Sequence, residues 1–241
     1  MSLRQKRVVV IGGTSGIGLA VAQGAMAAGA SVVVGSSSPD KLASIGERLQ
    51  GAEALAINVR DEASVEVFFA KVGAFDHLVF TAGDWGSFRN PTSLAELDID
   101  RAKEAFAVRF WGAVACVKHA HKHIREGGSI TLTDGTVAHR PRKGAPISTA
   151  MAGSIEHLVH ALAVDLAPLR VNGVCPAGVR TDVWNNIPEA QRADSFKRMT
   201  ERQLIKRIGE PEEIAEAYLY LMKGGYTTGQ VLRVDGGATS V

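Results

Sequence analysis

Short runs rich in β-branched residues alternate with longer segments of helical period along the chain. The runs predict seven strands, at Arg7–Ile11, Ser31–Gly35, Ala54–Asn58, His77–Thr81, Ser129–Thr133, Val171–Cys175 and Val231–Val234. The intervening segments predict helices at Gly18–Ala28, Pro39–Leu49, Glu62–Val72, Asp100–His123, Thr149–Ala167 and Pro211–Met222. Because strands that alternate with helices form βαβ units, we expect a three-layer, doubly wound α/β fold with a seven-stranded parallel sheet.

The chain length fits a single domain of this kind, because one doubly wound sheet can occupy all 241 residues. No linker, repeat or low-complexity tract divides residues 1–241. The polar segment 179–208 interrupts the alternation after the sixth strand. Ligands bind beyond the carboxyl ends of the strands in such sheets, so we expect this segment to be a substrate lid.

The composition argues against several classes of protein. A formal net charge of +2 gives little long-range field for nucleic acid. The two cysteines, Cys116 and Cys175, do not suggest a disulfide framework. The apolar run Val8–Ile11 is too short for a signal peptide, and no stretch reaches the roughly 18 apolar residues of a membrane helix. We therefore expect a cytoplasmic protein that acts on a small molecule, without a nucleic-acid or membrane partner.

A glycine-rich turn follows the first strand and opens a helix, with the sequence Gly12-Gly13-Thr14-Ser15-Gly16-Ile17-Gly18. Glycines let a chain turn sharply and let its backbone amides approach a pyrophosphate at the positive end of the helix. The turn therefore predicts a Rossmann-type dinucleotide site, with contacts from Gly12, Thr14, Ser15, Gly16, Ile17 and Gly18.

Further motifs follow in order along the chain: Asn58-Val59, Thr81-Ala82-Gly83, Pro176-Ala177-Gly178-Val179-Arg180-Thr181, Arg207-Ile208-Gly209 with Pro211-Glu212-Glu213, and Val234-Asp235-Gly236-Gly237. Together with the glycine spacing, this series resembles the short-chain dehydrogenase/reductase family over nearly the whole chain. The resemblance implies further cofactor contacts at Asn58, Val59, Ala82, Gly83, Pro176, Gly178, Val179 and Thr181. It also implies a homodimer or homotetramer built from the predicted helices 100–123 and 149–167.

The end of the second strand decides which dinucleotide binds, because a carboxylate there holds the ribose diol and excludes a 2′-phosphate. The run Ser36-Ser37-Ser38 contains no acid, and its hydroxyl groups can donate to a phosphate. We therefore favour NADP(H), with NAD(H) as the alternative. The arginine that clamps the phosphate in relatives is absent, because its aligned place holds Ser37 and Ser15 is not basic.

The resemblance also implies four catalytic positions: an asparagine, a serine, a tyrosine, and a lysine that lowers the pKa of the tyrosine. Alignment on the helix end near Leu166 places Arg109, Gly135, Ser148 and Ala152 at these positions. The three tyrosines of the chain all lie in its C-terminal region, at Tyr218, Tyr220 and Tyr226. The active site is therefore expected to be atypical, without the Asn-Ser-Tyr-Lys set.

Four residues remain candidates for the chemistry, namely Arg109, Asp134, His139 and Ser148. Arg109 is a possible fixed cation near the substrate, but a structural Arg109–Asp134 ion pair is favoured because an unpaired buried charge is costly. The imidazole of His139 suits proton transfer near neutral pH, although its basic loop is favoured to be solvated. No metal site is expected.

Two functions stay open. The first is an NADP(H)-dependent oxidoreductase with a non-standard active site, acting on an unknown carbonyl or alcohol. The second is a catalytically silent dinucleotide-binding sensor or scaffold protein. Consumption of NADPH in the presence of carbonyl compounds distinguishes them.

Overall fold

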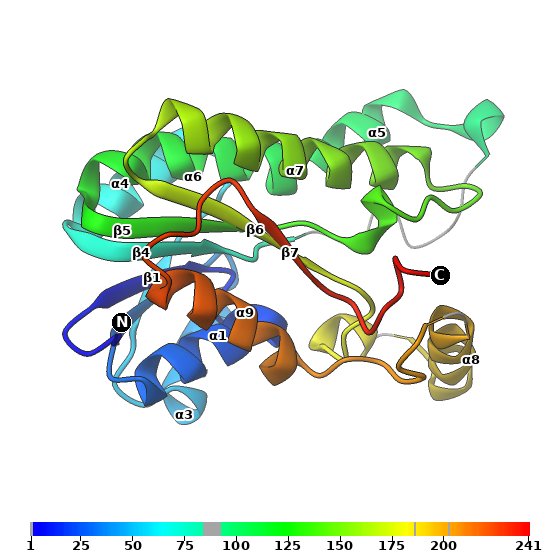
Figure 1. Ribbon diagram of the computed structural model, residues 1–241, viewed down its shortest axis with the longest axis horizontal. Helices are drawn as coiled ribbons and strands as arrows, with labels where there is room; N and C mark the ends of the chain where they lie inside the picture. Colours follow the sequence, from blue (N-terminus) through cyan, green and yellow to red (C-terminus); the bar gives the residue numbers. More distant parts are fainter. Residues whose placement is uncertain (1, 84–92, 186, 202) are drawn as a thin grey trace.

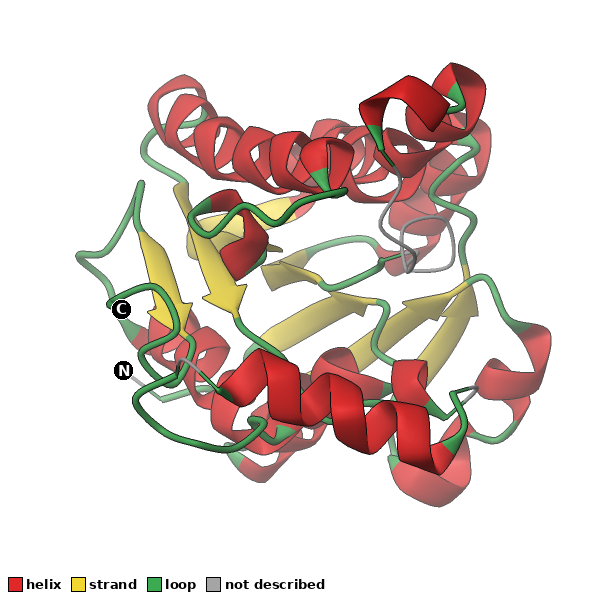
Figure 2. Ribbon diagram, turned by 90° about the vertical axis from the view of Figure 1, so that its right-hand side faces the viewer, coloured by secondary structure: helices red, strands yellow, loops and turns green. Residues whose placement is uncertain are grey.

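The structure is a computed structural model that describes residues 2–83, 93–185, 187–201 and 203–241. Seven parallel strands form one sheet in the order β3-β2-β1-β4-β5-β6-β7. Figures 1 and 2 show this sheet as the middle layer, with helices on both of its faces. The Rossmann-type, single-domain fold that the sequence predicts is confirmed.

The elements lie close to the predicted ones. The strands are β1 (Arg7–Ile11), β2 (Ser31–Ser36), β3 (Glu53–Ala56), β4 (Phe75–Phe80), β5 (Ile124–Thr133), β6 (Arg170–Pro176) and β7 (Val231–Val234). The helices are α1 (Gly16–Ala27), α2 (Pro39–Ala43), α3 (Ile45–Arg48), α4 (Glu62–Val72), α5 (Ile99–Phe106), α6 (Gly112–Ala120), α7 (Pro146–Asp165), α8 (Glu189–Thr200) and α9 (Pro211–Lys223).

Two of the predicted helices are divided. The segment 100–123 forms α5, a π-helical turn at Ala107–Trp111, α6 and a 3-10 turn at His121–His123. The segment Pro39–Leu49 forms α2 and α3, which meet at Ser44. The Ser44 hydroxyl lies within hydrogen-bond distance of the backbone oxygens of the preceding turn, and such bonds compete with continuous helix.

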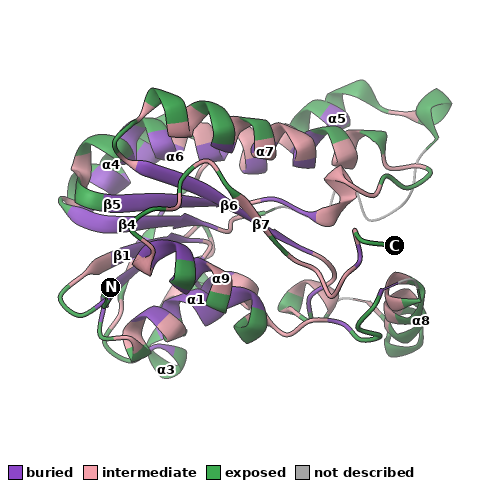
Figure 3. Ribbon diagram, viewed as in Figure 1, coloured by how far each residue is buried: buried purple, intermediate pink, exposed green. Residues whose placement is uncertain are grey.

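Each face of the sheet has its own apolar core. Helices α1 and α9 pack on one face, where the buried residues include Leu19, Val21, Ala25, Leu219 and Met222. Helices α4, α6 and α7 cover the other face, where the buried residues include Phe68, Phe69, Cys116, Ile155 and Val159. Figure 3 shows that the central strands are buried, and β6 is buried along its full length because both of its faces are covered. No helix among the described residues has the length and apolarity that crossing a membrane requires.

The polar segment 179–208 leaves the sheet after β6 and returns beside its own starting point. Val179 and Gly209 form a β-bridge, and the Arg180 N–H donates to the Gly209 oxygen at 2.9 Å. Inside the segment, the rings of Trp184 and Phe196 pack edge to face at 5.0 Å. Residues 186 and 202 lie outside the described residues. The excursion is therefore fixed at its base, while α8 has no buried residue among those described.

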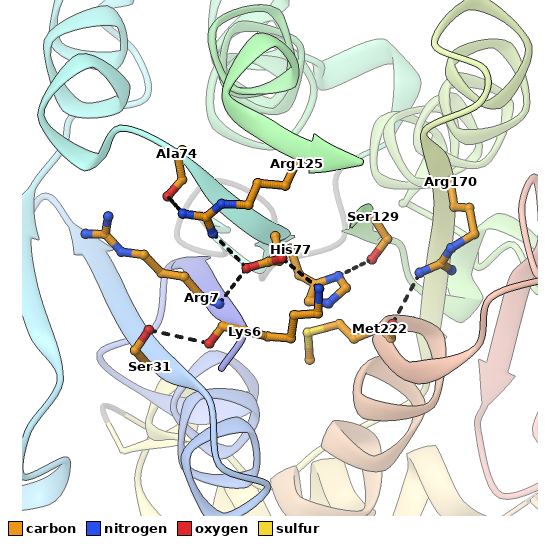
Figure 4. Close-up of polar contacts among 10 residues, drawn as sticks. Lys6, Arg7, Ser31, Ala74, His77, Arg125, Ser129, Arg170 and Met222 are labelled. Atoms are coloured by element: carbon orange, nitrogen blue, oxygen red, sulfur yellow. Dashed lines mark hydrogen bonds and ion pairs between the residues drawn. The ribbon is translucent and has the colours of Figure 1, made fainter. Parts of the chain in front are cut away.

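The amino-terminal edge of the sheet is held by a polar network (Figure 4). The buried Asp76 carboxylate accepts hydrogen bonds from Lys6 Nζ, the Arg7 N–H and Arg125. Burial opposes the charge of Asp76, but these bonds and cations lower its pKa. Next to it, His77 Nδ1 lies 2.9 Å from Ser129 Oγ, and burial lowers the pKa of His77 to about 4. This network lies at the opposite edge from the residues with predicted functions, so it is structural.

Candidate functional site

The predicted cofactor residues follow the carboxyl ends of β1, β2, β3, β4 and β6, and therefore lie along one edge of the sheet. The strand order reverses between β1 and β4, which is the point where doubly wound folds bind their ligands. The Gly12 N–H donates to the Gly35 oxygen at 2.8 Å, and Thr81 Oγ1 donates to the Ile11 oxygen at 3.0 Å. These bonds fix the glycine-rich turn beside the ends of β2 and β4.

The glycines of this turn lie where no side chain fits. Gly12 has a φ of +84°, and a Cβ there would lie 2.8 Å from the Ala82 nitrogen. A Cβ on Gly18 would lie 2.3 Å from the Gly12 oxygen and 2.4 Å from Thr81 Oγ1. The close approach of turn, helix and strand therefore explains why glycine is needed at these two positions.

The amino-terminus of α1 is suited to an anion. Ser15 is the N-cap residue, but its side chain makes no capping bond to the helix, and the first turn contains no acid. The backbone N–H groups of that turn consequently have no side-chain acceptor from the cap, as a pyrophosphate site requires. Thr181, from the loop after β6, packs against Gly16. A Cβ on Gly16 would lie 3.1 Å from the Thr181 Cβ. The turn and the β6 loop are thus adjacent at this edge of the sheet.

The other predicted cofactor residues lie along the same edge. Asn58 and Val59 follow β3, and Val59 packs against Gly112, where a Cβ would lie 2.9 Å from Val59 Cγ2. Ser38 Oγ accepts the Lys41 N–H at the start of α2, and the Ser36 hydroxyl accepts the Ser38 N–H. The remaining residues, Ala82, Gly83, Pro176, Gly178 and Val179, follow or end β4 and β6. Their assignment to the cofactor stays a prediction.

A second group of side chains gathers beyond β5 and β6. Asp134 directly follows β5, is only 2% exposed, and has no hydrogen-bond partner for either carboxylate oxygen among the described residues. Ligand atoms of Asp134, His139 and Cys175 all lie within 4.8 Å of one another. His139 Nε2 lies 2.8 Å from Glu156 Oε1 on α7, and Nδ1 lies 3.4 Å from an Arg233 nitrogen. Because a guanidinium only donates, the contact with Arg233 favours the tautomer with the proton on Nε2.

The electrostatic setting of Asp134 follows from this packing. Burial raises the pKa of its carboxyl group to about 7, and the negative charge of Glu156 adds to that effect. The Gly135 N–H, the Cys175 thiol and His139 lie close by and act in the opposite direction. Burial together with Asp134 raises the pKa of the Cys175 thiol, so the thiol is protonated. Asp134 is therefore a buried carboxyl group that exchanges its proton near neutral pH.

The predicted Arg109–Asp134 ion pair is wrong, because Asp134 has no hydrogen-bond partner in the described parts of the chain. Arg109 lies in the π-helical turn, and its guanidinium packs against Gly83, where a Cβ would lie 2.7 Å from Arg109 Nη2. Asp134 instead faces Glu156 and Cys175. The pair fails because Arg109 points to the end of β4, whereas the carboxyl group points to β6 and α7.

The other three positions aligned with the family's catalytic residues are Gly135, Ser148 and Ala152. A Cβ on Gly135 would meet nothing within 4 Å, so the site has free space at the aligned serine position. Ser148 is partly buried near the start of α7, with no side-chain hydrogen bond to any other described residue, and Ala152 is 2% exposed. Glu156 continues the same helical spacing, and the sequence reasoning missed it. The structure brings Asp134 and His139 together, and no hydrogen bond in the described parts of the chain joins Asp134 to Arg109 or Ser148.

The tyrosines do not lie in this group. Tyr218 is fully buried in α9, and its hydroxyl lies 2.8 Å from Thr133 Oγ1. Burial raises the pKa of Tyr218. Tyr220 and Tyr226 are 55% and 103% exposed. Tyr218 consequently serves as a packed structural residue.

Comparison with known proteins identifies the family of the chain. A family model described as enoyl-(acyl carrier protein) reductase matches residues 12–239. The chain is 36% identical to the short-chain dehydrogenase/reductase fsr5 of Gibberella fujikuroi, over 98% of this chain and 95% of that protein. The chain belongs to the short-chain dehydrogenase/reductase family. Members of this oxidoreductase family bind NAD(P)H, in agreement with the glycine-rich turn.

Solved structures of the family superimpose over nearly the full chain. The structure of MalC reductase/Diels-Alderase from Malbranchea aurantiaca has a TM-score of 0.91 and 33% identity, and covers 99% of this chain and 98% of its own. A small-chain dehydrogenase in complex with NADPH has a TM-score of 0.84 and 32% identity, and covers 98% and 100%. The short-chain dehydrogenase/reductase fold therefore extends over the whole sheet and both helical layers.

Proposed function

We propose that the protein is an NADP(H)-dependent oxidoreductase that reduces a carbonyl group, with Asp134 as the proton donor in place of tyrosine. The observation that carries this proposal is the carboxyl group of Asp134, which has no hydrogen-bond partner among the described residues and is buried at the carboxyl end of β5 with its pKa raised to about 7. An acid with a pKa near the working pH both holds its proton and releases it readily. A tyrosine would need a neighbouring cation to reach that range.

The chain's own residues supply the acid–base part of the reaction. Protonated Asp134 donates to the oxygen of a carbonyl compound, for which the space beside Gly135 leaves room. The Gly135 N–H and the Cys175 thiol lie close enough to stabilise the charge of Asp134 after the proton has left. Arg109 adds a fixed positive charge beside Gly83, and we assign no step to Ser148. NADPH, when bound, supplies the hydride.

Two features support NADP(H) as the cofactor. The residues after β2 are serines, and no acid stands where a ribose diol would be held. The similar small-chain dehydrogenase was solved in complex with NADPH. The pyrophosphate is proposed to lie on the amino-terminus of α1, between the glycine-rich turn and Thr181. The reductase activity named for MalC is consistent with this proposal.

The test is NADPH consumption with a panel of aldehydes, ketones and quinones. Asp134→Asn keeps the shape of the side chain but has no acidic proton, so it should lower kcat by about 100-fold or more while cofactor affinity is kept. Asp165→Asn makes the same change at the exposed end of α7 and should leave the rate within about twofold. Reduction by the wild type should also slow as the pH rises above about 7, because Asp134 then loses its proton.

The alternative function has a different outcome. Tight NADPH binding without turnover on any compound of the panel would favour a silent sensor or scaffold, and would contradict the proposal. Turnover that is unchanged in Asp134→Asn would keep the oxidoreductase but reject Asp134 as its acid.

Two further expectations become part of the proposal. The excursion 179–208 is proposed to cover the substrate, because its base at Thr181 touches the glycine-rich turn. A homodimer or homotetramer is proposed to form through α5, α6 and α7. Trp111, at the end of the π-helical turn between α5 and α6, is 61% exposed, and Val164 on α7 is 81% exposed. Light scattering on the purified protein measures the assembly directly, and a monomer at micromolar concentration would contradict it.

A further inference from the structure

Lys41 reaches from the segment after β2 to the glycine-rich turn. It lies in α2, and its Nζ donates a hydrogen bond to Ser15 Oγ at 3.2 Å. Ser15 is the N-cap residue of α1, and its hydroxyl makes no bond to that helix. The ammonium group is therefore held over the turn, next to the place predicted for the dinucleotide.

The position of this contact in the fold indicates which part of a dinucleotide it meets. Ile11 and Gly35 are register partners in the parallel pair of β1 and β2, so the ends of these strands lie side by side. In doubly wound folds, the residues at the end of the second strand meet the adenosine ribose. A 2′-phosphate on that ribose would consequently lie near the serines 36–38 and Ser15. Lys41 reaches the same place from α2.

The charge of Lys41 is not neutralised by any carboxylate that the structure describes. No Asp or Glu oxygen in the described part of the chain lies within ion-pair distance of Nζ, whose hydrogen bond is to the neutral Ser15 hydroxyl. The nearby Arg48 differs, because it lies 3.9 Å from the Asp182 carboxylate and donates to the Thr14 oxygen. Of these two cations, Lys41 is the one able to accept an anion without first losing an ion pair.

We propose that Lys41 is the residue that selects the 2′-phosphorylated dinucleotide, with Ser15 holding the ammonium group in place beforehand. The proposal rests on the proposed NADP(H) function and names the residue that determines its specificity. Neither Ser15 nor Ser37, which occupy the places aligned with a phosphate-binding arginine, is basic. A lysine ammonium group is a compact charge with three donors, suited to a phosphate monoester.

The experiment measures binding of two nucleotide fragments by calorimetry, which needs no substrate. The probes are adenosine 2′,5′-bisphosphate and 5′-AMP, which differ only in the 2′-phosphate. Lys41→Gln should weaken the bisphosphate by about tenfold or more and leave 5′-AMP within about twofold, because charge-assisted hydrogen bonds to the phosphate are lost. Lys41→Arg should retain most of the affinity. Lys71→Gln, on α4 away from this edge, is the matched control and should bind as the wild type does.

The outcomes separate the two proposals. A wild type that prefers the bisphosphate, with an unchanged preference in Lys41→Gln, would overturn the role of Lys41 but keep NADP(H). A wild type that binds both fragments equally would overturn the NADP(H) preference and the role of Lys41 with it. A wild type that binds neither would contradict dinucleotide binding itself. Equal thermal melting of all variants, expected because the Lys41 side chain is exposed, verifies that folding is unaffected.

Discussion

Replacing Asp134 with asparagine should make the protein more stable, and increasingly so as the pH rises. The carboxyl group ordinarily has a pKa of 3.8, whereas burial raises it to about 7 in the folded protein. Between these values the folded state binds a proton that the unfolded state has released. Stability therefore falls as the pH rises through this interval, and the loss is complete above the folded pKa.

The size of the effect follows from the interval. Each pKa unit corresponds to about 1.4 kcal/mol, so the interval from 3.8 to about 7 corresponds to about 4 kcal/mol at high pH. The unfolded group has already lost most of its proton at about pH 5. The stabilisation by Asp134→Asn should consequently grow by about 2 to 3 kcal/mol between about pH 5 and about pH 8.5. The low exposure of Asp134, 2%, means that little solvent screening reduces this value.

Urea unfolding of both proteins at the two pH values, at one fixed protein concentration, measures this difference. Asp165→Asn, with its exposed carboxyl group, should change the free energy of unfolding by less than about 0.5 kcal/mol at either pH. A difference between wild type and Asp134→Asn that is the same at both pH values would refute the reasoning. It would mean that folding does not raise the pKa of the Asp134 carboxyl group.

Three further perturbations test other parts of the structure. His77 is buried and its pKa is lowered to about 4, so the unfolded state binds more protons than the folded state between about pH 4 and 6.5. The free energy of unfolding should therefore fall by about 3 kcal/mol on acidification through that interval. In urea unfolding, His77→Gln should remove this pH dependence. Gly18→Ala places a Cβ 2.3 Å from the Gly12 oxygen and should abolish NADPH binding. Gly153→Ala, in open space on α7, should instead raise the free energy of unfolding by about 0.5 to 1 kcal/mol. Normal NADPH binding by Gly18→Ala would be inconsistent with the tight turn. Gly135→Ser should be tolerated within about 0.5 kcal/mol, because its Cβ meets nothing within 4 Å, and a large loss in melting temperature would show that the space is filled.

The fold was predictable because its signals are local and repeated. β-branched runs such as Val8–Ile11 are buried on both faces of a parallel sheet, and the glycine-rich turn marks where the first strand ends. The divided helices were not predictable from period alone. The break at Ser44 depends on how a hydroxyl rotates towards the preceding turn, and the π-helical turn at Ala107–Trp111 has no distinct apolar pattern.

The site was predictable in position but only partly in geometry. Because parallel strands end at one edge, Asp134 and His139 were both placed there, but Asp134 was expected to pair with Arg109 and the loop of His139 to be solvated. In the structure, ligand atoms of Asp134 and His139 instead lie within 4.8 Å of each other, and His139 Nε2 lies 2.8 Å from Glu156 Oε1. The ion pair with Arg109 was not formed, since pairing depends on side-chain direction and not on sequence distance. Glu156 has a signal that was available, because it lies on α7 four residues beyond the aligned lysine position. The sequence signal for Lys41 is weaker, and consists only of its place three residues after the helix-capping Ser38.

The destabilising effect of Asp134 bears on the choice between the two functions. At neutral pH and above, a buried carboxyl group that finds no hydrogen-bond partner in the described part of the chain lowers stability, and asparagine of nearly the same shape would remove that loss. For a protein that only binds a dinucleotide, the carboxyl group has a cost and no use, because the proposed cofactor contacts do not include it. For a reductase the same features, burial and a pKa near 7, are what make the group a proton donor. If Asp134→Asn is more stable than the wild type but loses turnover, the result favours the enzyme. If the variant is more stable and binds the cofactor as before, but neither the wild type nor the variant turns over a substrate, the result favours the silent form.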